Sequence, residues 1–109
     1  MKKKKLIYIS GKYKGKEEYK QKFETVIKGL VELEKERTNN KEYDYVFISP
    51  IHAFGFLYDE VSYEEGIEYC LALLDRCDEI WMMDNWEESK GACIEFGYAK
   101  ARGIHIEYI

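Results

Sequence analysis

The chain has 109 residues, 46% of them hydrophobic and 16% aromatic, which is enough for one packed core and excludes an intrinsically disordered protein. A net charge of −4 argues against a protein that binds nucleic acid, because such domains usually carry a basic excess. No apolar stretch reaches the length of a transmembrane helix or a signal-peptide core, so we expect a cytoplasmic protein without a membrane partner.

The first half of the chain predicts two buried strands with a helix between them. Residues 4–10 have a continuous apolar run at positions 6–9 behind a lysine-rich start, which is typical of a strand in a parallel sheet. Glycines and lysines in residues 11–16 indicate a loop. Apolar side chains then recur every three or four positions from residue 17 to about 37 and predict an amphipathic helix. Residues 43–50 predict the second strand.

The second half predicts two more helices and two more strands. Residues 51–62 are long and aromatic for a connecting loop, and such loops usually cover something. Ser62, with Glu65 three residues later, forms a capping box at the start of a helix that reaches Cys77. The remaining elements are a strand at 78–83, a loop at 84–91, a helix at 92–101 and a strand at 104–109.

Strands and helices alternate throughout, so we predict an α/β fold with a parallel sheet and treat residues 1–109 as a single domain. Right-handed crossovers most simply give the strand order 2-1-3-4, a small flavodoxin-like or Rossmann-like layer with about three helices. In that order the chain reverses direction between the first and third strands. Ligands of such sheets bind at the carboxyl ends of the strands at this point, where residues 10–16 and 84–91 are expected to lie.

Both of these loops have features of an anion site. Gly11 allows backbone amides to approach a ligand, while Lys12 and Lys14 add positive charge. Residues 89–91 precede a predicted helix N-terminus, which is a ready anion site. The alternative is that the glycines serve only turns and the lysines only solubility, because glycine-rich loops are weak motifs.

Glu95 stands among small and apolar residues, which raises the question of what keeps a carboxylate there. One interpretation is an ordinary acidic residue in the first helical turn that stabilises the helix. The other is a carboxylate aimed at a sugar, because carboxylates stabilise the oxocarbenium-like centre in glycosidic cleavage. Trp86, Phe54, Phe56 and Tyr58 would either stack on a base or fill the core.

Three segments together resemble the nucleoside 2-deoxyribosyltransferase superfamily: YISGKY at residues 8–13, CDEIW at 77–81 and SKGACIEFGYA at 89–99. The resemblance covers nearly the whole chain and is greatest to the short phage and bacterial proteins called domain of unknown function 4406. In the superfamily, the glutamate of the S/D-x-G-x-x-x-E segment is the nucleophile that takes the deoxyribosyl group. The resemblance therefore implies this role for Glu95 and a supporting role for Tyr8.

The residue at position 89 bears on the substrate that the resemblance implies. Superfamily members specific for nucleosides have aspartate there, whereas the branch that hydrolyses deoxynucleoside 5′-monophosphates has serine, which helps to hold the phosphate. Ser89 therefore favours a nucleotide, because a neutral donor tolerates a phosphate that an aspartate would repel.

The chain departs from the superfamily pattern at one position. Cys70 occupies the place of the second catalytic carboxylate, and a thiol is a poor acid for protonating a leaving base. Asp59, Asp84 or Glu87 are the candidates to replace it. Two main functions follow: an N-glycosidase or 2-deoxyribosyltransferase acting on a nucleoside or its 5′-monophosphate, or a non-catalytic binder of a nucleotide-derived or ADP-ribose-like signal in phage or defence. A structural subunit with a vestigial site is a weaker third.

The predicted site has Glu95 and Tyr8 as catalytic residues. Its predicted ligand-binding residues are Ser10, Gly11, Lys12, Tyr13, Lys14, Asp84, Trp86, Ser89, Lys90 and Gly91. We expect no metal and no cofactor, because the two histidines are far apart and the three cysteines lack metal-ligand spacing. We also expect a homodimer or larger assembly, since so small a layer leaves apolar patches uncovered.

Overall fold

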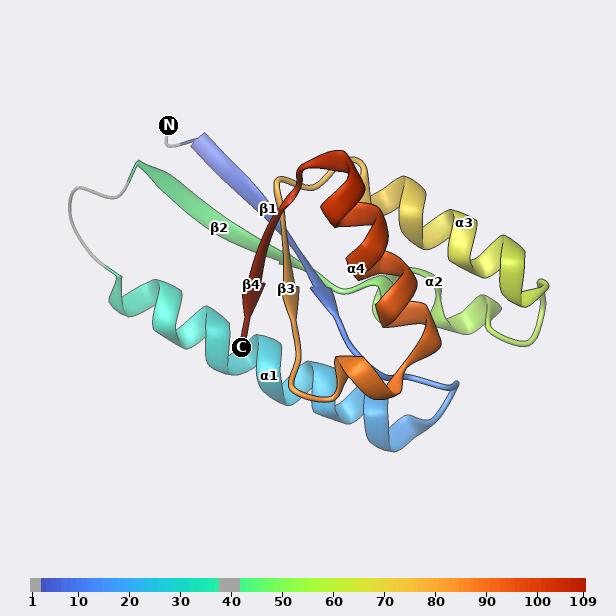
Figure 1. Cartoon of the computed structure of the whole chain (residues 1–109). Helices are drawn as coiled ribbons and strands as arrows, with labels where there is room; N and C mark the ends of the chain where they lie inside the picture. Colours follow the sequence, from blue (N-terminus) through green and yellow to red (C-terminus); the bar gives the residue numbers. More distant parts are fainter. Residues whose placement is uncertain (1–2, 38–41) are drawn as a thin grey trace.

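The computed structural model describes residues 3–37 and 42–109, which fold around one parallel sheet (Figure 1). Its strands are β1 (Lys3–Ser10), β2 (Tyr43–Ile48), β3 (Glu79–Met82) and β4 (His105–Tyr108). They lie in the order β2-β1-β3-β4, and every neighbouring pair is parallel. The predicted fold class and strand order are confirmed, and β1 occupies the interior of the sheet.

Helices cover both faces of this sheet (Figure 1). Helix α1 (Glu17–Glu36) packs on one face, and α3 (Tyr63–Leu74) and α4 (Lys90–Arg102) pack on the other. The alternation of side chains along β1 divides the core between them. Ile7 and Ile9 pack toward α1, whereas Tyr8 joins the cluster beneath α3 and α4.

The aromatic segment after β2 is not the open loop that its sequence suggested. It forms a short helix α2 (Pro50–Phe54) followed by a 3-10 turn η1 (Gly55–Leu57), which brings the number of α-helices to four rather than about three. Ser49 caps α2, because its hydroxyl accepts a hydrogen bond from the His52 amide at 3.3 Å. Pro50 has a backbone already suited to the first helical turn.

A capping serine stands at the start of both α3 and α4. Ser62 caps α3, because its hydroxyl accepts from the Glu65 amide at 3.1 Å, which confirms the predicted N-cap. The Glu65 carboxylate accepts from this same hydroxyl at 3.2 Å. Helix α4 begins two residues earlier than predicted, because Ser89 caps it by accepting from the Ala92 amide at 3.1 Å. Glu95 therefore lies in the second turn of α4, not the first.

Within the described part of the chain, no helix combines the length and apolarity needed to cross a membrane.

Candidate functional site

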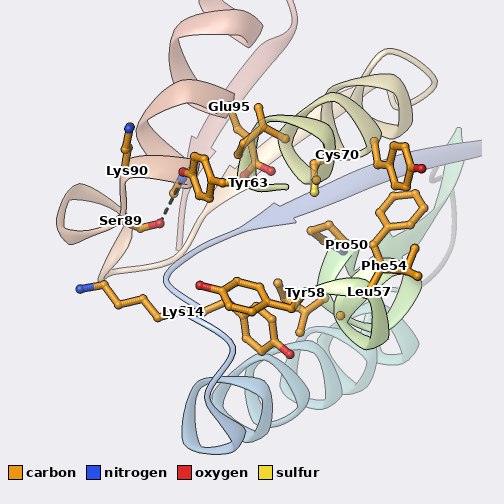
Figure 2. Close-up of a pocket in the computed structure, with 18 of the residues that line it drawn as sticks. Lys14, Pro50, Phe54, Leu57, Tyr58, Tyr63, Cys70, Ser89, Lys90 and Glu95 are labelled. Carbon is orange, nitrogen blue, oxygen red and sulfur yellow. Dashed lines mark hydrogen bonds between the residues drawn. The ribbon is translucent and has the colours of Figure 1, made fainter. Parts of the chain in front are cut away.

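A cavity of about 560 Å³ opens where the first three strands end (Figure 2). The first wall residues after these strands are Gly11, Pro50 and Ser89, following β1, β2 and β3 respectively. Helix α4 forms one side, and α2, η1 and residues 63–70 of α3 form the other. The volume lies within the range of small-molecule sites, roughly 300–1,000 Å³. The cavity is therefore at the carboxyl edge of the sheet, where the strand order predicts a ligand.

The Glu95 carboxylate forms part of the wall and is held by β1, one of the two interior strands of the sheet. Glu95 is only 6% exposed and lies on the face of α4 that Ala92 and Ala99 bury against the sheet. Tyr8 donates a hydrogen bond from its hydroxyl to Oε2, and Ser10 donates one to Oε1 at 2.6 Å. Residues two apart on a strand face the same side, so β1 supplies both donors from one face.

The burial of Glu95 changes its acidity. Removal from water raises the pKa of the Glu95 carboxyl to about 7, and the hydrogen bonds from Ser10 and Tyr8 oppose this rise. Both forms of the carboxyl are therefore present near neutral pH. Burial and the Glu95 charge raise the pKa of the Tyr8 phenol well above its usual value, so this hydroxyl remains a hydrogen-bond donor.

Cys70, on α3, faces the same cavity (Figure 2). Burial and the nearby Glu95 charge raise the pKa of its thiol to about 11, and the contact with Tyr8 opposes this only in part. The thiol is consequently protonated at neutral pH and releases its proton poorly.

Positive and polar groups gather at one end of the cavity (Figure 2). Ser89, Lys90 and Gly91 belong to the N-terminus of α4, whose amide groups favour an anion. Lys14 reaches this end from the loop after β1, where it has a left-handed backbone with φ 54°. That loop closes through a hydrogen bond from the Lys16 amide to the Tyr13 carbonyl at 3.1 Å.

Gly11 lets the two loops of the predicted anion site approach each other. A Cβ atom at this position would lie 2.8 Å from the Met83 sulfur, closer than ordinary contacts allow. The neighbouring Lys12 amide donates to the Asn85 side chain at 3.2 Å, which ties the loop after β1 to the loop after β3. The structure thus brings together the two segments that the sequence analysis expected to meet.

Four predicted ligand residues lie outside the cavity wall: Ser10, Lys12, Asp84 and Trp86. Lys12 forms an ion pair with Glu88 at 2.9 Å, and Asp84 forms one with Lys22 at 2.7 Å. Trp86 stacks on Phe96 with ring centroids 4.6 Å apart and an interplanar angle of 20°. The first contact joins the two loops to each other, and the other two join the loop after β3 to α1 and α4. Tyr8 also lies outside the wall, and both Tyr8 and Ser10 reach it only through Glu95.

A family model described as a domain of unknown function (DUF4406) matches residues 5–108 of the chain. The chain belongs to this family. No curated protein and no solved structure matches the chain. For this DUF4406 protein, the site must therefore be interpreted from its own geometry.

The sequence predicted the aromatic wall of the DUF4406 cavity only in part: Tyr13, Phe54 and Tyr58 were candidates, whereas Tyr63 and Tyr69 were not. Tyr13 meets Tyr58 edge-on with ring centroids 5.4 Å apart, and Phe54 lies 5.7 Å from Tyr69. Phe56, which the sequence grouped with these rings, is 77% exposed and is not in the wall. The available signal was the apolar stripe along α3, where Ile67 and Cys70 line the cavity while Leu71 and Leu74 pack in the core.

Carboxylates are scarce in the site of this DUF4406 protein. Among the described residues, Glu95 is the only carboxylate that lines the cavity. Asp59, Asp84 and Glu87, the candidates for a second acid, do not contribute to the wall. Within the described ranges there is also no group of three histidine, cysteine or acidic side chains arranged to hold a metal ion.

Proposed function

We propose that this DUF4406 protein cleaves the N-glycosidic bond of a nucleoside 5′-monophosphate and transfers the glycosyl group to water or to another base, with Glu95 as the nucleophile. The observation that carries the proposal is the buried Glu95 carboxylate, which lines a ligand-sized cavity and accepts hydrogen bonds on both of its oxygens. A carboxylate in the core destabilises a fold unless it is protonated or paired. A chemical role accounts for its presence in the cavity wall.

The charge distribution along the cavity suits each part of a nucleotide. The phosphate would bind at the end formed by Ser89, Lys90 and Lys14, where amide groups and ammonium groups favour an anion. The sugar would lie beside Glu95, and the base would contact the aromatic wall. The resemblance to the nucleoside 2-deoxyribosyltransferases supports the same placement, since Ser89 and Glu95 match its phosphate-binding and nucleophilic positions.

The chemistry proceeds in two steps through the ionised form of Glu95. A carboxylate oxygen bonds to C1′ of the sugar as the bond from C1′ to the base nitrogen breaks. Water or an acceptor base then attacks C1′ and releases the carboxylate. Tyr8 and Ser10, both on β1, are positioning residues in this scheme, because their hydrogen bonds hold the Glu95 carboxylate in place.

A second function is favoured by the absence of another acid. With Cys70 in place of a carboxylate and no other acidic side chain in the described wall, the same cavity would hold a nucleotide-derived or ADP-ribose-like signal without cleaving it. Binding would then use the phosphate end and the aromatic wall, and Glu95 would accept hydrogen bonds from sugar hydroxyls.

One experiment separates these two functions. The protein is incubated with nucleosides, nucleoside 5′-monophosphates and NAD-derived nucleotides, while base release is followed by chromatography and binding by calorimetry. An enzyme releases base, and Glu95→Gln abolishes this release while retaining binding, since the amide cannot form the glycosyl ester. Glu68→Gln, on the exposed surface of α3, is the matched control and should retain full activity. Binding without any base release would favour the second function, and neither binding nor release would refute both.

A further inference from the structure

The cavity can supply a nucleophile, but its described wall has no second carboxyl group to protonate a leaving base. Glycosidases generally use two carboxyl groups, one to attack or activate water and one to protonate the leaving group. Here Glu95 is the only carboxylate that the described wall contains. The Cys70 thiol, with a pKa of about 11, is a poor acid at neutral pH. Burial also raises the pKa of the Tyr13 and Tyr63 phenols, so they are no better.

The lack of a second carboxyl group matters for the cleavage of some bases and not for others. An ordinary purine or pyrimidine leaves its sugar as an anion unless an acid protonates it during cleavage. A base that is already a cation, such as a pyridinium or an N7-alkylated purine, leaves as a neutral molecule. It takes the electron pair of the broken bond onto its positively charged nitrogen and needs no proton.

The walls of the cavity also suit a cationic ring. Phe54 lies at the end away from Lys14 and Lys90 (Figure 2), and its ring centroid is 5.7 Å from that of Tyr69, which also lines the cavity, whereas Tyr58 lies beside the Lys14 loop. Aromatic faces attract cations, and this attraction strengthens when water is excluded. No side-chain amide lines the described wall, so none is available to form a two-point hydrogen-bonded contact with the polar edge of an ordinary base.

We infer that the substrates are 5′-monophosphates of ribosylated cationic heterocycles, a conclusion that rests on the proposed N-glycosidase function. The negative phosphate meets the lysine end, and the positive ring lies between Glu95 and the aromatic wall. In the first step the bond between C1′ and a Glu95 oxygen forms, the bond from C1′ to the cationic nitrogen breaks, and its electron pair neutralises the ring. In the second step a water oxygen bonds to C1′, the Glu95 carboxylate leaves, and the water proton passes to solvent.

Two matched pairs of compounds test this inference. Nicotinamide mononucleotide and its reduced form differ in the charge of the base, as do 7-methylguanosine 5′-monophosphate and guanosine 5′-monophosphate. We expect kcat/KM to be at least about 100-fold higher for the cationic member of each pair, the lower end of what a general acid contributes. We also expect Glu95→Gln to abolish cleavage of both cationic compounds.

Cationic bases also leave more easily without any enzyme. A variant that places an acid in the cavity distinguishes this intrinsic lability from the effect of the missing proton donor. Cys70→Asp should raise kcat/KM for guanosine 5′-monophosphate at least about tenfold, within the range of acid catalysis, while Cys70→Ser should not. Equal cleavage of charged and neutral bases by the wild-type protein would overturn this inference and leave the proposed function intact. No cleavage of any of the four compounds by the wild-type protein would overturn both.

Discussion

Replacing Glu95 by glutamine should change how the stability of the protein depends on pH. Burial raises the pKa of this carboxyl from its ordinary value of 4.5 to about 7. The folded state therefore binds the proton more tightly than the unfolded state does. The contribution of this tighter proton binding to the free energy of unfolding is complete below pH 4.5 and is lost as the pH rises to 7. At about 1.4 kcal/mol for each pH unit between these pKa values, the loss amounts to about 3 kcal/mol.

Urea denaturation between pH 4 and pH 8.5 measures this effect. Glutamine does not titrate, and the other ionisable groups are shared, so their contributions largely cancel in the difference between the two proteins. We expect the free energy of unfolding of the wild-type protein, relative to that of Glu95→Gln, to fall by about 3 kcal/mol across this range. For Glu68→Gln, at an exposed site, the difference from wild type should stay nearly constant. A constant difference for Glu95→Gln as well would refute the burial of an ionisable carboxyl at this position.

Two further predictions concern the loops around the cavity. Ser89→Ala removes the cap of α4 and should lower the free energy of unfolding by about 1 kcal/mol in urea denaturation. It should also weaken nucleotide binding in calorimetry, and unchanged values of both would contradict the assigned role. Gly15→Ala should destabilise the protein by about 1 kcal/mol or more, because Gly15 has φ 70° and a Cβ there would lie 2.6 Å from the Tyr58 ring. Gly97→Ala, inside α4 with open space around it, should instead stabilise by about 0.5–1 kcal/mol, and equal effects of the two changes on the urea midpoint would be inconsistent with this reasoning.

The sheet could be predicted because its information is local. Apolar runs separated by amphipathic helices determine the number and direction of the strands, and right-handed crossovers limit their order. The N-cap at Ser62 was visible for the same reason, because the capping hydroxyl and the Glu65 amide that it accepts from lie within one helical turn. Helix α2 was missed because the aromatic composition of the segment obscured a start signal, Ser49 followed by Pro50.

The site was predicted only in part, because a sequence does not show which way a loop side chain points. Asp84 and Trp86 follow β3 as expected, yet one pairs with Lys22 on α1 and the other stacks on Phe96 of α4. Both partners depend on how the helices pack, which spacing along the chain does not reveal. The acidity of Glu95 likewise depends on its burial between α4 and the sheet in the folded protein.

The position of β1 inside the sheet has a consequence during synthesis. Its partner β3 lies far along the chain, with Ile7 opposite Glu79, and at ribosomal rates of about 5–20 residues per second β1 waits roughly 4–14 s for that partner. During this interval an apolar strand is exposed and able to pair with other nascent chains. Lys3, Lys4 and Lys5 stand at its beginning, where their charges oppose such association. In the folded protein two of these lysines bind carboxylates on the neighbouring strands, Lys4 with Asp44 and Lys5 with Glu79.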